Sequence, residues 1–360
     1  MHAIIYFVTL VMLAFGTSPS FKDYKKGILV DEFIYEEAPF PSCHAATITE
    51  TPTGLVAAWF GGTHERHPDV GIWVSRNDNG QWTAPVEAAN GVINDTLRYP
   101  TWNPVLYQVS GGDLMLFYKV GPKPSEWWGM LMTSDDGGET WTAPRKLPDG
   151  FIGPVKNKPV LLENGLLVCP SSTEGDGWKI HLEVTPDFGK TWEKIGPLDQ
   201  GNDDINAIQP SLLVHEDGKL QLLCRSRSRR VATAWSSDMG KTWSAMEKTT
   251  LPNNNSGTDA VTLQDGRHLL VYNHVLPPEG EHKGPRTPLH VSLSHDGVDW
   301  EASLILEDSE ISQYSYPSII QGSDGMVHIV YTWRRERIKY VKVDPEQITA
   351  TPILGLEWPE

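Results

Sequence analysis

Short runs of apolar and β-branched residues recur along the chain, and turn residues separate them. Five of these runs lie directly before a similar turn sequence: Gly71–Ser75, Gly129–Thr133, Ile180–Val184, Val231–Trp235 and Leu289–Leu293. Two more extended runs lie upstream in each unit, for example Asn103–Gln108 with Asp113–Lys119 and Pro210–Val214 with Lys219–Cys224. No helical periodicity of useful length is present. The pattern predicts small antiparallel sheets of about four strands each.

The turn after each of the five runs carries a related sequence that ends in tryptophan. It reads SDDGGETW at 134–141, TPDFGKTW at 185–192 and SSDMGKTW at 236–243. Degenerate copies are SRNDNGQW at 75–82 and SHDGVDW at 294–300. The tryptophans are separated by 59, 51, 51 and 57 residues. In such a turn Asp accepts hydrogen bonds from the turn amides, Gly supplies positive φ, and Trp packs beside the next strand. Repetition at this period is typical of the blades of a β-propeller.

A sixth unit lacks the turn sequence but has three extended runs: Tyr316–Gln321, Met326–Trp333 and Arg337–Val343. The predicted fold is therefore an all-β, six-bladed β-propeller that forms one domain over residues 19–360. The strand-like segment Ile28–Tyr35 is expected to close the ring by joining the sixth blade. A β-sandwich or β-helix would need shorter periods or no Trp-bearing turn.

The first residues have the pattern of a targeting segment. Ala3 to Phe15 form an apolar run, and Gly16, Thr17 and Ser18 are small residues suited to a cleavage site. The run is too short to span a bilayer, so residues 1–18 are predicted to be a signal peptide of a secreted or periplasmic protein. No later stretch is long and apolar enough for membrane insertion of the mature chain.

Composition narrows the possible partners. The 360 residues include 30 Lys and Arg against 46 Asp and Glu, which gives a net charge of −16. Such an acidic protein repels nucleic acid and anionic lipid. Three widely spaced cysteines, Cys43, Cys169 and Cys224, are expected to be buried thiols rather than a disulfide framework. The sequence indicates no cofactor and no metal site, although His64, Glu65 and His67 lie close together.

Functional residues are expected where the innermost strands begin, because these strands line the central channel of a propeller. The segments at those positions are polar: 42–44, Asn103, 156–158, Gln209, 256–259 and 314–316. The turn sequences themselves are interpreted as structural.

Repeated S-x-D-x-G-x-T-W sequences on a six-bladed propeller resemble the sialidase (exo-α-neuraminidase) superfamily, from about Phe40 to about Pro345. These turns, called Asp boxes, are specific for the fold and less so for activity. The resemblance implies three arginines that bind a substrate carboxylate, an Asp acid/base, and a Tyr nucleophile assisted by a Glu.

Several residues match that set. The resemblance implies that Asp69, in the loop before the first Asp-box strand, is the acid/base. Arg225 and Arg227 precede the fourth motif as the second family arginine does, and Arg286 precedes the fifth as the third does. Tyr314, in Gln-Tyr-Ser-Tyr, stands where the nucleophile is expected.

Two family residues are missing. The segment Phe40–His44 has no arginine where the first one belongs, and Gln209 stands at or beside the position of the Glu. An amide cannot accept the proton of a tyrosine, so Asp204 or Asp259 could take that role. Gln209 and Asp259 are also expected to contact the substrate. His44 is either a substrate contact or a base.

The leading hypothesis is a secreted exo-acting glycoside hydrolase that removes a terminal, acidic sugar from a glycan. Two arginines offer bidentate forks to a carboxylate, and a phenol becomes more acidic beside guanidinium groups. One alternative is a lyase acting at a uronic acid, with Arg225, His44 and Tyr314 as its catalytic set. Another is a carbohydrate-binding propeller without catalysis.

Overall fold

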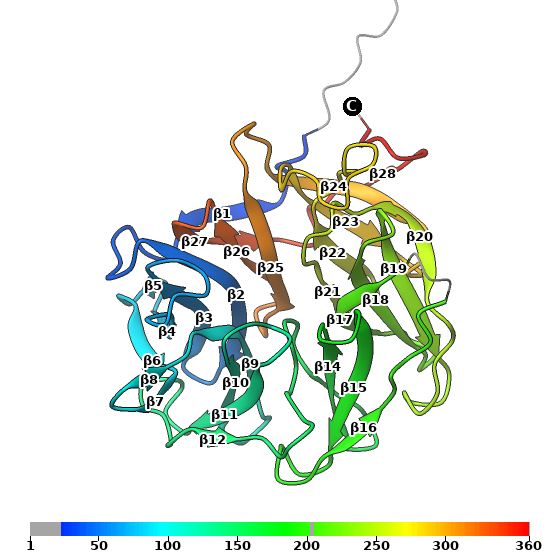
Figure 1. Cartoon of the computed structure of the whole chain (residues 1–360). Helices are drawn as coiled ribbons and strands as arrows, with labels where there is room; N and C mark the ends of the chain where they lie inside the picture. Colours follow the sequence, from blue (N-terminus) through cyan, green and yellow to red (C-terminus); the bar gives the residue numbers. More distant parts are fainter. Residues whose placement is uncertain (1–22, 202–204, 360) are drawn as a thin grey trace, which may run out of the picture.

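The computed structural model describes residues 23–201 and 205–359, which form an all-β propeller of six blades around a central axis (Figure 1). The predicted fold is thus confirmed. The predicted signal peptide, residues 1–18, lies outside the described residues. Among the residues described, no helix has the length and apolar character needed to cross a membrane.

The first three blades follow one another along the chain. Blade 1 comprises β2 (Ser42–Thr51), β3 (Gly54–Gly62), β4 (Gly71–Asp78) and β5 (Gln81–Trp82), with β6 (Val86–Ala89) also paired to β4. A hairpin of β7 (Val92–Asn94) and β8 (Leu97–Arg98) leads to blade 2: β9 (Thr101–Gln108), β10 (Leu114–Val120), β11 (Trp128–Ser134) and β12 (Arg145–Lys146). Blade 3 comprises β13 (Val160–Leu161), β14 (Leu167–Thr173), β15 (Lys179–Thr185) and β16 (Glu193–Ile195).

The last three blades complete the ring. Blade 4 comprises β17 (Ala207–Val214), β18 (Leu220–Ser226), β19 (Arg230–Ser236) and β20 (Glu247–Pro252). Blade 5 comprises β21 (Asp259–Thr262), β22 (His268–Tyr272), β23 (Leu289–Ser294), β24 (Trp300–Glu307) and β28 (Thr351–Pro352). Blade 6 comprises β25 (Tyr314–Gln321), β26 (Val327–Trp333), β27 (Arg337–Val343) and β1 (Ile28–Phe33).

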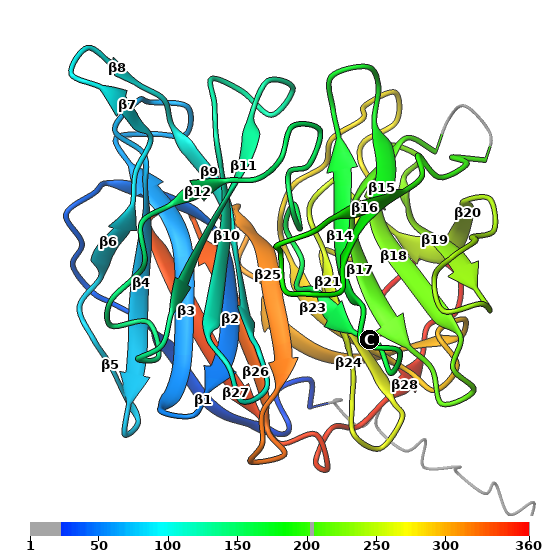
Figure 2. The ribbon, with the colours of Figure 1, turned by 90° about the horizontal axis from the view of Figure 1, so that it is seen from below.

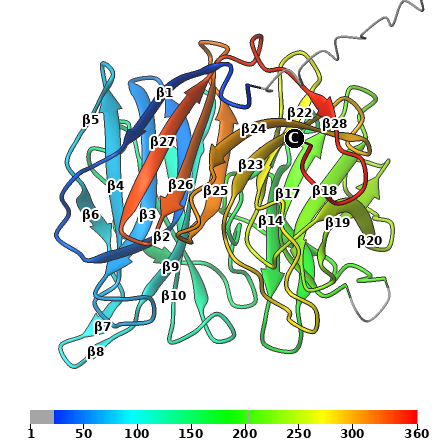
Figure 3. The same ribbon diagram turned by 90° about the horizontal axis from the view of Figure 1, so that it is seen from above.

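The N-terminal strand closes the ring as expected. β1 pairs antiparallel with β27, for example Asp31 with Val341 and Phe33 with Lys339. The two strands lie side by side in Figure 3. The outer strand of blade 6 therefore comes from the opposite end of the chain.

Apolar residues gather in six clusters among the described residues, one between each pair of neighbouring blades. The Asp-box tryptophans pack into these clusters: Trp141 between blades 1 and 2, Trp192 between blades 2 and 3, and Trp243 between blades 3 and 4. All three cysteines are buried and free, as predicted. The repeated tryptophan therefore packs between neighbouring blades.

The Asp-box turns satisfy their own polar groups. In blade 2 the Asp136 carboxylate accepts hydrogen bonds from the Thr140 amide (2.9 Å), the Thr140 hydroxyl (2.5 Å) and the Ser134 hydroxyl (2.7 Å). These hydrogen bonds hold the pKa of Asp136 well below its usual range. The motif is thus a turn whose polar groups are satisfied locally. In Figure 2, the end of the propeller that carries β5 lies opposite the end from which β7 and β8 project.

Candidate functional site

Four inner strands bulge close to the axis. At the bulges, residues with side chains adopt positive φ: Ala45 (58°), Asn103 (35°), Gln209 (56°) and Tyr316 (53°). The ladders shift register at the same places, between His44 and Thr47 in β2 and between Ser315 and Ser318 in β25. A bulge breaks the strict alternation of side chains and aims one of them in a new direction. Here the bulges bring side chains from different blades together.

Tyr316 lies at the centre of this cluster. Its hydroxyl oxygen accepts a hydrogen bond from Nη1 of Arg225 (2.8 Å) and another from Nε2 of Gln209 (3.2 Å). The ring of His44 lies 4.2 Å away, centroid to centroid. Two donors aimed at one phenol oxygen stabilise negative charge on it.

Positive groups surround the tyrosine. The Arg286 guanidinium lies 5.5 Å from the Tyr316 ring centroid, and Lys156 Nζ lies 5.8 Å from it. Burial lowers the pKa of Arg286 to about 10, a shift that Tyr316 opposes and that Arg225 and Arg335 increase. Lys156 donates to three oxygens, on Asn157, Thr258 and Pro317, although burial lowers its pKa to about 7. Arg286 is therefore still charged at neutral pH.

His44 is neutral. Burial holds its pKa well below the usual range, and the charges of Arg335, Arg286, Arg225 and Lys156 act in the same direction. Its Nδ1 lies 3.0 Å from the Thr332 hydroxyl. Burial and these neighbouring positive groups make a second proton on this imidazole unfavourable.

Arg335 is a member of the cluster that the sequence analysis missed. It lies in the turn between β26 and β27, and its carbonyl accepts a hydrogen bond from the Cys43 amide (2.8 Å). Its side chain pairs with Glu65 (2.5 Å). The turn that carries Arg335 is thus hydrogen-bonded through its backbone to Phe40–His44, the segment that lacks the expected arginine. The available signal was the Arg334-Arg335 pair in the one blade without an Asp box.

Tyr314, the predicted nucleophile, does not face the cluster. It is 1% exposed and packs in the apolar core between blades 5 and 6, near Trp333. The bulge between Ser315 and Ser318 explains the difference, because it turns Tyr316 and not Tyr314 towards the axis. Proline follows the bulge residue in Asn103-Pro104, Gln209-Pro210 and Tyr316-Pro317, and this pattern could have selected Tyr316 from the sequence.

Asp69, the predicted acid/base, lies in the loop between β3 and β4, the loop that also carries Glu65. Its carboxylate accepts hydrogen bonds from the Thr63 amide (3.0 Å) and hydroxyl (2.6 Å), and it lies 2.7 Å from Nδ1 of His67. Burial alone would raise the pKa of Asp69, but the hydrogen bonds from Thr63 and His67 outweigh it and lower the pKa.

Asp259, predicted to bind substrate, is instead occupied within the fold. Its carboxylate contacts Lys158 Nζ (3.0 Å), the Ser211 hydroxyl (3.0 Å) and the Ile319 amide (3.0 Å). These partners belong to different blades, so Asp259 ties the blades together at the axis. The alternative residue, Asp204, lies outside the described residues.

The chain resembles known proteins both in sequence and in fold. The family described as BNR repeat-like domain matches residues 53–329. The chain belongs to this family. No curated protein matches the chain in sequence.

Solved structures resemble this BNR repeat-like propeller at low identity. A protein of unknown function from Dyadobacter fermentans is 17% identical, with 88% of this chain and 98% of the other covered and a TM-score of 0.69. The NanB sialidase from Streptococcus pneumoniae is 13% identical (89% and 71% covered, TM-score 0.70). The intramolecular trans-sialidase from Ruminococcus gnavus is 14% identical (91% and 99% covered, TM-score 0.69). At these identities the likeness shows a sialidase-like fold.

Proposed function

We propose that the protein is a secreted glycoside hydrolase that removes a terminal acidic sugar from a glycan. The observation that carries this proposal is the phenol oxygen of Tyr316, which accepts hydrogen bonds from Arg225 and Gln209 amid further cations. Guanidinium groups bind carboxylates through bidentate, charge-assisted hydrogen bonds. Arg225, Arg286 and Arg335 would hold the carboxylate of the sugar. Sialidases are among the solved structures of similar fold, which is consistent with an acidic sugar as substrate.

The Tyr316 phenol would first release its proton to water, and the phenolate would then attack the anomeric carbon as that carbon releases its glycosidic oxygen. Water would hydrolyse the resulting glycosyl-tyrosine and restore the phenolate. Gln209 cannot accept the phenol proton, and burial beside positive groups makes protonation of His44 unfavourable. We therefore assign stabilisation of the phenolate to Arg225 and Gln209, and a neutral, hydrogen-bonding role to His44.

Asp69 would protonate the leaving oxygen and then take a proton from the attacking water. Because its pKa is lowered in the free protein, the protonated form is populated only on the acid side. Turnover should therefore increase as the pH falls below neutrality, until binding of the sugar carboxylate is lost.

A second candidate is a lyase acting at a uronic acid. The same phenolate could take the proton next to a carboxylate that Arg286 and Arg335 neutralise, after which the glycosidic oxygen leaves. Gln209 favours this candidate, because an elimination needs no carboxylate beside the tyrosine.

The test is incubation with a panel of glycans that end in sialic or uronic acids, with mass detection of the products. A free acidic sugar supports the hydrolase, and an unsaturated uronate supports the lyase. Binding without products would leave a carbohydrate-binding propeller. The variant Tyr316→Phe should abolish product formation, whereas Tyr314→Phe, two residues away, should not.

A further inference from the structure

Two guanidinium groups stack on one tryptophan beside the cluster. Arg225 and Arg227 lie 5.1 and 4.2 Å from the ring centroid of Trp178. Arg225 is buried and donates a hydrogen bond to the Tyr316 hydroxyl oxygen, whereas Arg227 is exposed. Side chains two residues apart on an extended chain are separated by about 6.6 Å. Arg227 lies just after the end of β18, so it continues the positive surface beyond Arg225 by a distance on the scale of one sugar residue.

Arg227 opens into a hollow of about 510 Å³ between the turn after β18 and the long loop after β22. Arg229 lines the same hollow and donates a hydrogen bond to the Pro278 carbonyl (2.9 Å). Within residues 23–201 and 205–359, neither arginine forms an ion pair with a carboxylate. Glu281 and His282, from the loop after β22, also line the hollow. The hollow thus has two arginines whose charge the described residues leave available.

One asparagine connects this hollow to the cluster. Asn255 Oδ1 accepts a hydrogen bond from Nε of Arg225 (2.8 Å), and its Nδ2 donates to the carbonyl of His282 (2.9 Å). Asn255 is itself buried and adopts positive φ, 63°. The wall of the hollow and the guanidinium that contacts Tyr316 are therefore held in one fixed arrangement.

We propose that this hollow is a second anion subsite, which takes a sulfate or carboxylate on the sugar next to the terminal acidic one. The proposal rests on the proposed function, because the first sugar must occupy the Tyr316 cluster. It assigns the substrate class: a glycan with negative groups on two consecutive sugars. The guanidinium of Arg227 would form bidentate hydrogen bonds with the anionic group on the second sugar, and Arg229 adds positive charge beside it.

The experiment measures calorimetric affinities for two disaccharides that share a terminal uronic acid and differ only in a sulfate on the second sugar. The wild-type protein should bind the sulfated one more tightly by about 10- to 150-fold. Arg227→Ala should remove this preference and leave the affinity for the unsulfated disaccharide unchanged. Arg229→Gln should reduce the preference in part. Arg267→Ala, which removes the same charge on the opposite face, is the matched control and should bind like wild type.

Arg225→Ala separates the two proposals, because it should weaken binding of both disaccharides. If Arg225→Ala weakens both while Arg227→Ala leaves the sulfate preference intact, the second subsite is overturned and the proposed function stands. If Arg225→Ala changes neither affinity, the sugar does not bind at the Tyr316 cluster and both proposals are overturned. An equal loss for both disaccharides in Arg227→Ala would also overturn the second subsite.

Discussion

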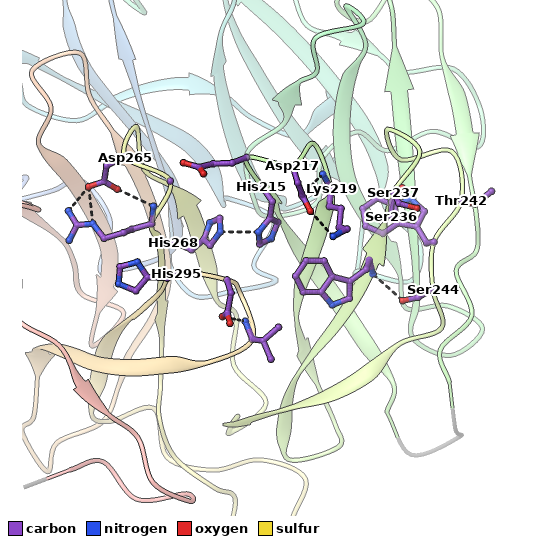
Figure 4. A pocket seen from close by; sticks show the side chains of 17 residues that line it. His215, Asp217, Lys219, Ser236, Ser237, Thr242, Ser244, Asp265, His268 and His295 are labelled. Carbon is purple, nitrogen blue, oxygen red and sulfur yellow. Dashed lines mark hydrogen bonds and ion pairs between the residues drawn. The ribbon is translucent and has the colours of Figure 1, made fainter.

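The two ends of the propeller differ in how far their charged side chains are paired. On the Asp-box end, a hollow of about 1000 Å³ lies between blades 4 and 5 (Figure 4). Its charges are paired locally, as in Lys219 with Asp217 (2.6 Å) and Arg267 with Asp265 (2.6 Å). At the other end, Arg225 and Arg286 contact Tyr316 and have no carboxylate partner among the described residues.

This difference indicates which feature marks a site. The Asp-box hollow has about twice the volume of the hollow beside Arg227, but its lysine and arginine side chains form ion pairs with neighbouring aspartates. The Tyr316 cluster holds buried cations around one oxygen, an arrangement that is costly to build without an anionic ligand. The proposed site therefore rests on available charge held in a fixed arrangement and not on the volume of a hollow.

The largest expected effect separates two neighbouring tyrosines. Tyr316→Phe removes the oxygen that Arg225 and Gln209 contact, so kcat should fall by at least about 10³-fold with the sugar still bound. Tyr314→Phe alters a core side chain and should keep kcat while lowering thermal stability. Steady-state kinetics on the best glycan of the panel measures both. Equal loss in the two variants would contradict the assignment.

The next effect compares two arginines of blade 6. Arg335 and Arg337 each pair with a glutamate at 2.5 Å, but only Arg335 acts on His44 and Arg286. Arg335→Ala should therefore raise KM for an acidic sugar by about 10- to 150-fold. Arg337→Ala, the matched control, should leave KM unchanged. A similar KM for both variants would remove Arg335 from the site.

A smaller effect is expected from the Asp boxes, and it should concern stability alone. Asp136→Asn removes a carboxylate that accepts hydrogen bonds from Thr140 and Ser134, so the thermal midpoint should fall by a few degrees. Asp135→Asn makes the same charge change at the exposed neighbour and should have little effect. Calorimetry gives the midpoints, and kcat/KM should be equal in both variants. A loss of turnover in Asp136→Asn would show that the two ends are coupled.

The smallest effect is a pH dependence from the Asp-box hollow. Nε2 of His268 lies 3.1 Å from Nδ1 of His215, whose own Nε2 lies 3.1 Å from Oε1 of Gln221. Gln221 Nε2 donates to Thr233 and to Gly297, so its Oε1 is the acceptor. The pair therefore fits two neutral imidazoles, with His268 donating to His215.

Burial lowers the pKa of both histidines, that of His268 to about 4, with His215 and His295 acting in the same direction and Asp296 opposing. The unfolded chain binds these protons near the usual pKa of about 6.5, so folding stability is complete above that pH and decreases as the pH falls towards 4. The loss should be on the order of 1 kcal/mol after solvent screening. Urea unfolding between pH 4 and 7 should show it, and His268→Gln should flatten the profile. An unchanged slope in this variant would exclude the pair as its source.

The fold was predictable because its signals are local and repeated. Each Asp box combines an Asp, a Gly and a Trp within one turn, and the spacing of Trp141, Trp192 and Trp243 gives the blade length directly. The pairing of β1 with β27 followed from a strand without a partner at one end and a blade without an outer strand at the other.

The site was predictable only in part, because it depends on bulges and on contacts between distant blades. Tyr314 and Tyr316 are equivalent on a regular strand, and only the φ of 53° at Tyr316 distinguishes them. Arg335 reaches the cluster from a turn that no strand pattern marks. Asp259 lies at the predicted channel position, but its partners Lys158 and Ser211 come from other blades and occupy it.

The most direct test of the central claim is covalent trapping of the reacting residue. The protein would be incubated with a fluorinated form of whichever acidic sugar it releases, and digested peptides would be analysed by mass spectrometry. We predict one added sugar on the peptide that contains Tyr316, located on Tyr316 by fragmentation and absent in Tyr316→Phe. A sugar attached to Tyr314 or to another residue, or turnover of the substrate by Tyr316→Phe, would contradict the account.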